Sequence, residues 1–390
     1  MRIVRFLSLA VALVAAFNGP LAAADPVEIP VLLSTTGNFA FIGKQEVDSF
    51  QIVEKTVNRT GGIRGRSLHF AVTDVQSSPV VTLEVATPIL AKHPALVIGP
   101  DSTAQTSALL PLLPPETVLY SLSVAYSPPR GSNVFSVMIG NFELFSSAVR
   151  FLRKKGLTRL ALISTTDASG VDQLQQIERV VSLPENRGVS LVAKESFALT
   201  DLNVTAQLTR LKAAAPQALL IGTTGVAFGT ILHGVTDLSW DLPLVTNAGN
   251  INRVQMAQYA SFLPKSIYFT GFRFMGYDIS KAGKVRDAQK FFYDSMHAAG
   301  VARPDYANAN CWDAAWIVVN ALRALGPEAT GPQLHRYIES LHDFAGINGM
   351  YDFRTGNQRG LDAEASFIVL WDPGKQDWVP VSTFGGDPLS

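Results

Sequence analysis

Short apolar runs alternate along the chain with segments whose apolar positions recur every three or four residues. The periodic segments predict amphipathic helices, as with Val47, Phe50, Val53 and Val57 on one face. The apolar runs predict strands at 29–33, 68–73, 95–98 and 118–121, then at 160–163, 190–193, 218–221, 242–245 and 267–269. Two successive rounds of strand and helix predict an α/β protein with two domains, each built on a parallel sheet flanked by helices.

The last third of the chain has a different pattern. It predicts a long helix from about 306 to 325 and another near 333–341, and strands return only at 350–353, 367–370 and 378–381. This pattern does not make a third domain. We expect it to complete the first two, which requires the chain to cross between them more than once.

The amino terminus has the pattern of a secretory signal. Arg2 and Arg5 precede an uncharged apolar stretch at 6–17, and alanines at 22–24 offer a cleavage site near Ala24. We expect a signal peptide at 1–24 and a periplasmic protein, with a helical membrane anchor as the alternative. Cys311 is the only cysteine, so an internal disulfide is excluded. Because no cysteine lies near the predicted cleavage site, we do not expect a lipid-anchored form.

Composition and motifs narrow the function further. The chain is 47% hydrophobic with 32 basic and 32 acidic residues, so nothing favours nucleic acid as a partner. The motifs G-x-S-x-G, H-E-x-x-H, C-x-x-C and G-x-G-x-x-G are missing, and the six histidines have no metal-ligand spacing. We therefore predict no catalytic residue, no metal and no cofactor.

One strand end carries a candidate binding loop. Gly99 and Pro100 follow the third predicted strand, and Ser102 or Thr103 is placed to cap the next helix. In a parallel sheet such loops bind ligands, and free N–H groups and a hydroxyl at a helix start suit a carboxylate. A plain helix cap without a ligand is the alternative.

Four segments resemble one known family. They are STTGNFAFIGK at 34–44, VNRTGGIRGRSLHF at 57–70, LVIGPDSTAQTSALLPLL at 96–113 and INGMYDFRTGN at 347–357. In this order and spacing the chain resembles the branched-chain amino-acid (leucine/isoleucine/valine) binding proteins of ABC transporters. The resemblance implies a type I periplasmic binding protein fold, with two Rossmann-like lobes joined by three crossovers and the ligand between them. It places lobe one at 25–144 plus 277–342 and lobe two at 145–276 plus 343–390.

The resemblance also assigns the binding residues. In lobe one it implies that Ser102 and Thr103 hold a carboxylate and that Ser123 and Val124 form a second contact loop, where Ala125 replaces a common threonine. Phe41, with Phe39, is a candidate aromatic wall, and core packing is the alternative for both.

In lobe two the resemblance places contacts at Thr224, Gly225 and Ala248. The family's tyrosine and acid, which hold a ligand ammonium, are missing there, and a buried cation needs a paired charge. We therefore expect an aromatic or apolar carboxylate rather than an α-amino acid, with an amino-acid-like ligand as the alternative. Asp167 is expected to cap a helix, and Arg253 and Arg273 either attract an anion or are solvated.

Together these features predict a monomeric solute-binding component of an ABC uptake transporter. It is expected to close about a hinge on one small molecule and then engage the permease subunits. A ligand-sensing subunit of a receptor is the first alternative and a secreted hydrolase the second. Ser102 and Ser123 are expected to anchor the ligand carboxylate, so replacing both with alanine is expected to weaken binding.

Overall fold

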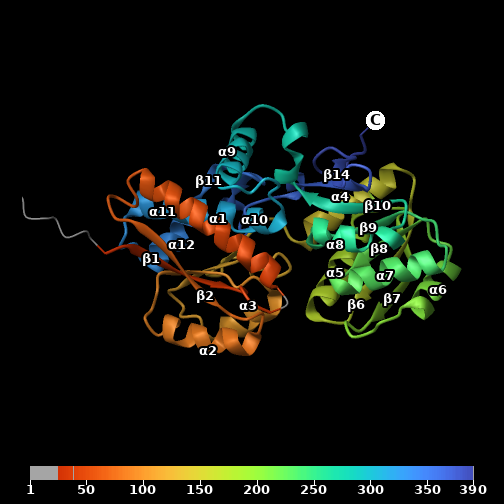
Figure 1. The fold of residues 1–390 in the computed structure, drawn as a ribbon, viewed down its shortest axis with the longest axis horizontal. Coiled ribbons are helices and arrows are strands. Elements are labelled where there is room, and N and C mark those ends of the chain that lie inside the picture. Colours follow the sequence, from red (N-terminus) through yellow and green to blue (C-terminus); the bar gives the residue numbers. More distant parts are fainter. Residues whose placement is uncertain (1–24, 38, 390) are drawn as a thin grey trace, which may run out of the picture.

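The computed structural model describes residues 25–37 and 39–389. The predicted signal peptide at 1–24 lies outside the described residues. Figure 1 shows two halves side by side, which we call the first and second lobes. Each is built around one large sheet.

The first lobe contains a parallel sheet of five strands in the order β2-β1-β3-β4-β5. Alternate residues face opposite sides, so that Leu32 and Val97 pack under α2 and α3 while Val31 and Ile98 pack on the other side. The strands are β1 Val27–Leu33, β2 Leu68–Asp74, β3 Leu96–Ile98, β4 Val118–Ser121 and β5 Val134–Ser136. The helices are α1 Ala40–Arg59, α2 Pro79–Leu90, α3 Thr103–Leu109, α10 Tyr306–Asn310, α11 Trp312–Leu325 and α12 Gly331–Ser340.

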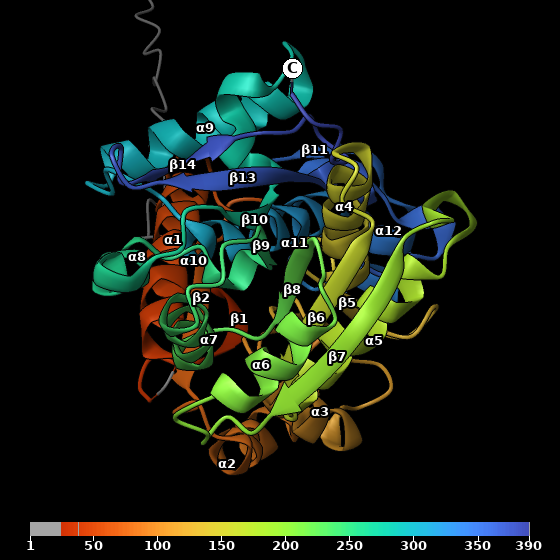
Figure 2. The ribbon, with the colours of Figure 1, turned by 90° about the vertical axis from the view of Figure 1, so that its right-hand side faces the viewer.

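The second lobe contains seven strands in the order β14-β13-β10-β9-β8-β6-β7, and Figure 2 shows them from β7 at one edge to β14 at the other. The parallel strands are β6 Arg159–Thr165, β7 Ser190–Phe197, β8 Ala218–Gly222, β9 Leu244–Thr246 and β10 Ile267–Phe272. The helices are α4 Asn141–Lys154, α5 Ala168–Val181, α6 Thr205–Ala213, α7 Val226–Asp237 and α8 Arg253–Gln258. Two late strands, β13 Ser366–Asp372 and β14 Asp377–Pro380, are antiparallel, which the pattern of apolar runs does not distinguish.

The chain passes between the lobes three times, as the resemblance implied. It leaves the first sheet after β5 and returns after β10 through α9 Lys284–Ala298 to α10–α12, where α10 and α11 pack on α1. It then forms a small hairpin, β11 His342–Gly346 and β12 Gly349–Asp352, before entering the second sheet at β13. The predicted boundaries at 144, 276 and 342 each fall inside an element, so the division of the chain at those residues stays a prediction.

The predicted helix from 306 to 325 is wrong in one respect, since it is broken at Cys311 into α10 and α11. Asn310 turns its amide toward Glu46 of α1 and the carbonyl of Leu122, at 2.6 and 2.9 Å, so the short α10 is held by tertiary bonds. Apolar periodicity alone continues through this break. Cys311 is buried, as predicted.

A buried carboxylate joins α11 to the hairpin. Asp313 accepts hydrogen bonds from the Tyr351 hydroxyl at 2.8 Å and from the backbone N–H groups of Ile347 and Asn348 at 2.9 and 3.3 Å. Through these contacts the segment INGMYDF, at 347–353, connects α11 to the third crossing between the lobes.

We expect Asp313→Asn to lower the free energy of unfolding by about 2–4 kcal/mol, because one end of the amide would turn an N–H donor toward the backbone N–H of Ile347 or of Asn348. Urea unfolding followed by circular dichroism measures this. Asp294→Asn, on the exposed surface of α9, is the matched control and is expected to change little. Equal stability of the two variants would contradict a stabilising role for the hydrogen bonds to Asp313.

Candidate ligand-binding site

Three loops meet at the carboxyl ends of β1, β3 and β4. Gly99 has a φ of +94°, and a Cβ there would lie 2.1 Å from the carbonyl oxygen of Leu32. Only glycine allows so close an approach, so the loop after β3 lies against the end of β1. This contact places Asp101 beside Ser34, whose N–H and hydroxyl donate to the Asp101 carboxylate at 2.9 and 2.8 Å.

Thr103 and Ser123, both predicted site residues, are brought together. Their hydroxyl oxygens are 2.9 Å apart although they come from different loops. Thr103 is half-buried at the start of α3 and Ser123 is 2% exposed. The Ser136 hydroxyl donates to the Ser123 carbonyl at 2.9 Å and fixes that loop. The Ser123 hydroxyl also accepts from the Tyr126 N–H at 3.3 Å. The pair therefore lies in a hydrogen-bonded loop at the edge where a parallel sheet places ligands.

Ser102 is the N-cap of α3, as the sequence predicts. Its hydroxyl accepts from the Gln105 N–H at 3.3 Å and lies 2.7 Å from the Gln105 side-chain amide. The hydroxyl of Ser102 is thus engaged within its own helix start, whereas that of Thr103 points to the neighbouring loop. A contact from Ser102 to a ligand stays a prediction.

Arg359 is a site residue that sequence reasoning missed. Its guanidinium is buried and donates to the carbonyls of Val124 and Val137 at 2.7 Å each, and also to that of Tyr126. Burial lowers the pKa of Arg359, and the nearby acids Glu143 and Asp172 oppose that shift. The predicted contact residue Val124 is thereby tied to the chain segments that join the lobes. A single arginine in a polar loop gives no sequence signal for this role.

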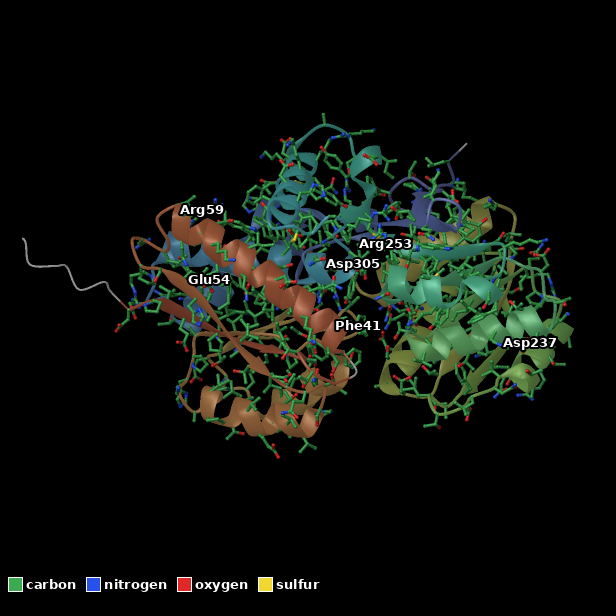
Figure 3. All side chains as sticks on the ribbon, viewed as in Figure 1. Phe41, Glu54, Arg59, Asp237, Arg253 and Asp305 are labelled. Atoms are coloured by element: carbon green, nitrogen blue, oxygen red, sulfur yellow. The ribbon has the colours of Figure 1, made fainter. Side chains whose placement is uncertain are left out.

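Aromatic side chains lie near these loops. Phe41, in the first turn of α1, is 50% exposed, and Figure 3 shows it at the edge of the first lobe that faces the second. Phe39 is 37% exposed, so the alternative of core packing is wrong for both residues. Tyr306, also missed from the sequence, stacks on Phe272 with ring centroids 5.5 Å apart.

The second lobe presents amides and hydroxyls after β8 and β9. Asn250 donates to the Thr223 carbonyl at 2.8 Å and accepts from the Gly225 N–H at 3.1 Å. Asn247 donates to the buried Gln173 of α5, and the hydroxyls of Thr165 and Thr223 are 3.2 Å apart. The loops at 222–225 and 247–250 contain no ionisable side chain.

The predicted residues of this lobe differ in accessibility. Thr224 and Gly225 are both half-buried. The Gly225 N–H donates to the Asn250 side chain and is therefore not free for a ligand. Ala248 was predicted to contact the ligand, but its side chain is fully buried in the hydrophobic core and is not available for such a contact. The family resemblance placed Ala248 in the predicted site, where the family's acid is expected, but in this chain it starts the 3-10 turn Ala248–Asn250 and is buried.

The two lobes approach each other through helices that begin at strand ends. α3 of the first lobe and α5 of the second are neighbours. Asp167 caps α5 by accepting from the Ser169 N–H at 3.2 Å, as predicted. The starts of both helices therefore lie near the boundary between the lobes.

Arg253 and Arg273 both make contacts within the protein. Arg253 pairs with Asp377 at 2.7 Å and lies over the Trp378 ring, and Figure 3 shows it beside Asp305 between the lobes. Arg273 donates to the Glu364 carbonyl at 3.1 Å and lies over the Phe384 ring. Neither arginine is fully solvated, and each has a structural role that needs no ligand.

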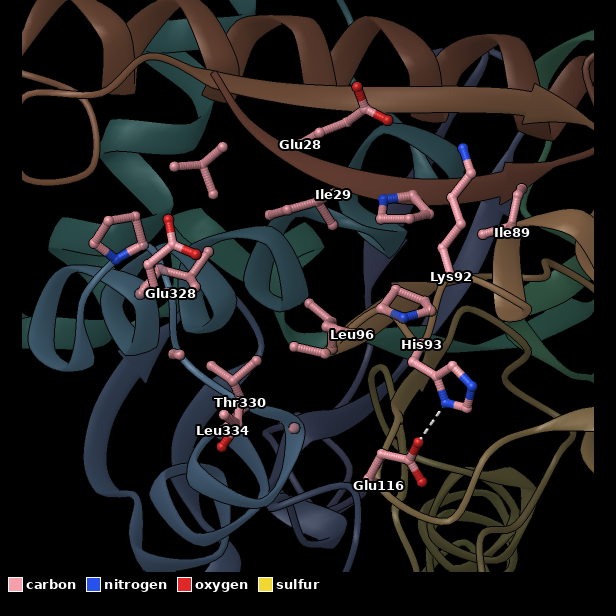
Figure 4. A pocket seen from close by; sticks show the side chains of 18 of the residues that line it. Glu28, Ile29, Ile89, Lys92, His93, Leu96, Glu116, Glu328, Thr330 and Leu334 are labelled. Carbon is pink, nitrogen blue, oxygen red and sulfur yellow. Dashed lines mark hydrogen bonds and ion pairs between the residues drawn. The ribbon is translucent and has the colours of Figure 1, made fainter. Parts of the chain in front are cut away.

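Two cavities lie away from the predicted site residues. One of about 790 Å³ is at the amino ends of the first-lobe strands, where His93 and Glu116 are 2.6 Å apart (Figure 4). Another of about 620 Å³ lies around Arg253, Asp305 and Trp378. None of the eight predicted site residues lines either cavity. Within residues 25–37 and 39–389, no three His, Cys, Asp or Glu side chains are grouped for a metal, and no helix has the length and apolarity to cross a membrane.

Comparisons with solved structures show the same fold. A periplasmic binding protein type 1 from Bordetella pertussis Tohama I is 19% identical, covers 92% of this chain and 100% of its own, and has a TM-score of 0.78. An extracellular ligand-binding receptor from Rhodopseudomonas palustris HaA2 is 15% identical over 92% and 100% of the chains, with a TM-score of 0.77. The branched-chain amino acid transporter substrate binding protein LivJ from Streptococcus pneumoniae, in complex with isoleucine, is 18% identical over 90% and 97%, with a TM-score of 0.71.

A comparison with curated proteins finds no significant match. The sequence profile described as "Periplasmic binding protein" matches residues 26–375, which is most of the chain. Since this match extends through both lobes and all three crossings, the chain belongs to the periplasmic binding protein family.

Proposed function

We propose that this protein binds a small carboxylate with an aromatic or apolar body between its lobes and delivers it to an ABC permease. The observation that carries the proposal is the Thr103–Ser123 hydroxyl pair at the strand ends of the first lobe. Hydroxyl and N–H donors at such a position suit an anion.

The second lobe is expected to determine which ligands the proposed site favours. A ligand ammonium enclosed between the lobes would need a paired charge, and its burial without one costs several kcal/mol. The loops after β8 and β9 offer only amides, hydroxyls and backbone groups. The acid after β6, Asp167, caps α5 through Oδ2, and its Oδ1 is buried without a hydrogen-bond partner among the described residues. A ligand without an ammonium avoids this cost. The Streptococcus pneumoniae protein, whose structure contains isoleucine, is expected to differ at this end of its site.

Phe41 and Tyr306 supply the apolar part of the proposed site. Phe41 is half-exposed at the rim of the first lobe, and Tyr306 is held flat against Phe272 near the junction. Closure of the lobes would remove these rings and the ligand body from water and shift the equilibrium toward the closed form. The closed form would then present both lobes to the permease.

A thermal-shift screen tests the proposed function. Aromatic and branched aliphatic carboxylates are expected to raise the melting temperature more than the corresponding α-amino acids. A ligand at about 100 times its Kd contributes about 2.7 kcal/mol, which corresponds to a shift of a few degrees. Stabilisation by leucine above every simple carboxylate would contradict the proposal.

A further inference from the structure

Two acidic side chains near the proposed carboxylate site interact electrostatically, the buried Glu46 and the half-buried Asp101. Glu46 of α1 is fully buried, and Asp101 lies in the loop that leads to Thr103. The two carboxyl groups repel each other electrostatically, and burial raises the pKa of both. Two negative charges here would oppose binding of a third, so the protonation of this pair matters to an anionic ligand.

The hydrogen-bond donors around the two acids are unequal. Asp101 accepts from the N–H and the hydroxyl of Ser34. The Gln105 amide, turned so that both of its ends are satisfied, donates to Asp101 at 2.8 Å. Three donors favour the ionised form of Asp101.

Glu46 has a single donor. Its Oε1 accepts from Asn310 Nδ2 at 2.6 Å, and the same Nδ2 donates to the Leu122 carbonyl at 2.9 Å. Its Oε2 is buried and has no hydrogen-bond partner among the described residues, and the same holds for Asn310 Oδ1. A proton on Oε2 would make Glu46 a donor as well as an acceptor, and a carboxylic acid and a side-chain amide can pair through two parallel hydrogen bonds, which would satisfy both of these atoms.

We propose that Glu46 carries a proton at neutral pH, shared with Asn310, and that this proton limits the charge beside the Thr103–Ser123 pair so that a carboxylate binds together with it. Glu46 thus acts as a positioning residue that sets the charge selectivity of the site. The coupling to a carboxylate rests on the proposed function, whereas the protonation of Glu46 does not.

The surroundings of Glu46 support a neutral side chain. Burial raises the pKa of the Tyr306 hydroxyl and of the Cys311 thiol, which keeps both uncharged. The charged or titratable groups on the elements around Glu46 are Asp101 after β3, Asp305, Tyr306 and Cys311 on α10 and at its ends, and Arg359, whose charge acts on Tyr306. Arg359 bonds to backbone carbonyls and forms no hydrogen bond with Glu46.

The expected dependence of stability on pH has a definite sign. Because burial raises the pKa of Glu46, the folded protein binds more protons than the unfolded chain above the unfolded pKa. The contribution of Glu46 to stability is therefore present at low pH and is lost as the pH rises through the folded pKa. Glu46→Gln keeps the shape of the side chain and a donor for Asn310 Oδ1 but has no group that titrates. The stability of this variant is therefore expected not to fall over this pH range.

Infrared spectroscopy at neutral pH tests the proton without any ligand. The wild-type protein is expected to show the carbonyl band of a protonated, buried carboxylic acid, which shifts in heavy water and is missing in Glu46→Gln. A wild-type spectrum without this band overturns the proposal even if the variant fails to fold.

Titration with benzoate, and with neutral benzamide as its isostere, tests the coupling. Benzoate affinity of the wild type is expected to fall by up to tenfold per pH unit above the folded pKa of Glu46, the limit for one linked proton. In Glu46→Gln it is expected to stay level, and benzamide affinity is expected to stay level in both. An equal slope for benzoate in both proteins overturns the coupling. Failure of benzoate and of every other carboxylate to bind, with the infrared band present, counts against the proposed function and leaves the proton on Glu46 supported.

Discussion

Replacing Arg359 with methionine is expected to lower the free energy of unfolding by about 3–5 kcal/mol. The guanidinium donates to backbone carbonyls from the loop after β4 and from the segment after β5. Methionine fills much of the volume but leaves those buried carbonyls without donors. Denaturant unfolding of the purified protein measures the change. Because these bonds join the Val124 loop to the crossing segments, we also expect weaker ligand binding.

Arg354→Met is the matched control for this prediction. Arg354 lies five residues earlier in the same segment, but it is exposed and pairs with Asp352 on the surface. Exposed pairs contribute little, so this variant is expected to remain close to wild type. If Arg359→Met were as stable as Arg354→Met, the buried guanidinium would not hold the two segments together.

The double variant Thr103→Val and Ser123→Ala is expected to weaken binding of a carboxylate by about 100-fold. One hydroxyl of the pair donates to the other, which leaves one proton for the ligand, and a hydrogen bond to a charged group contributes about 1.5–3 kcal/mol, or up to about 100-fold in affinity. Valine keeps the shape of threonine, and the Ser102 cap of α3 is left intact. Isothermal titration with the carboxylate that is most stabilising in the thermal screen measures the loss.

The chain offers a matched control for the hydroxyl pair. Thr106 lies in α3 like Thr103, and its hydroxyl is 3.0 Å from that of Ser121 at the end of β4, where both are fully buried. Thr106→Val removes the same kind of contact and keeps the Ser121 hydroxyl, which accepts from the Ser123 N–H at 3.2 Å. A similar loss of affinity in this variant and in the double variant would show that the effect comes from the fold rather than from the site.

Much of the fold could be predicted because apolar runs and helical periodicity report burial directly. The strands of both lobes follow from such runs, and the three crossings follow from the family resemblance. The strand β5 was not predicted, although β3 and β9 have the same length and were. The helix α7 is largely apolar, so its periodicity is weak. The break at Cys311 depends on bonds from Asn310 to residues far away in the sequence.

The candidate site was predictable where the local sequence determines geometry. A glycine, a helix cap and a strand end place Ser102, Thr103 and Ser123 correctly at the carboxyl edge of the sheet. Ala248 was included because the resemblance aligns it with the family's acid, and the sequence does not reveal that its side chain is buried in the core. Arg359 and Glu46 were missed because their roles arise from tertiary contacts with loops more than fifty residues away.

The most direct test of the account compares leucine with 4-methylpentanoate, the same molecule without its ammonium, by isothermal titration calorimetry. The matched pair isolates the ammonium, because the carboxylate and the branched body are unchanged. We expect 4-methylpentanoate to bind more tightly, since the loops after β8 and β9 offer no charge to pair with an ammonium. Tighter binding of leucine would contradict the proposed preference for a carboxylate without an ammonium.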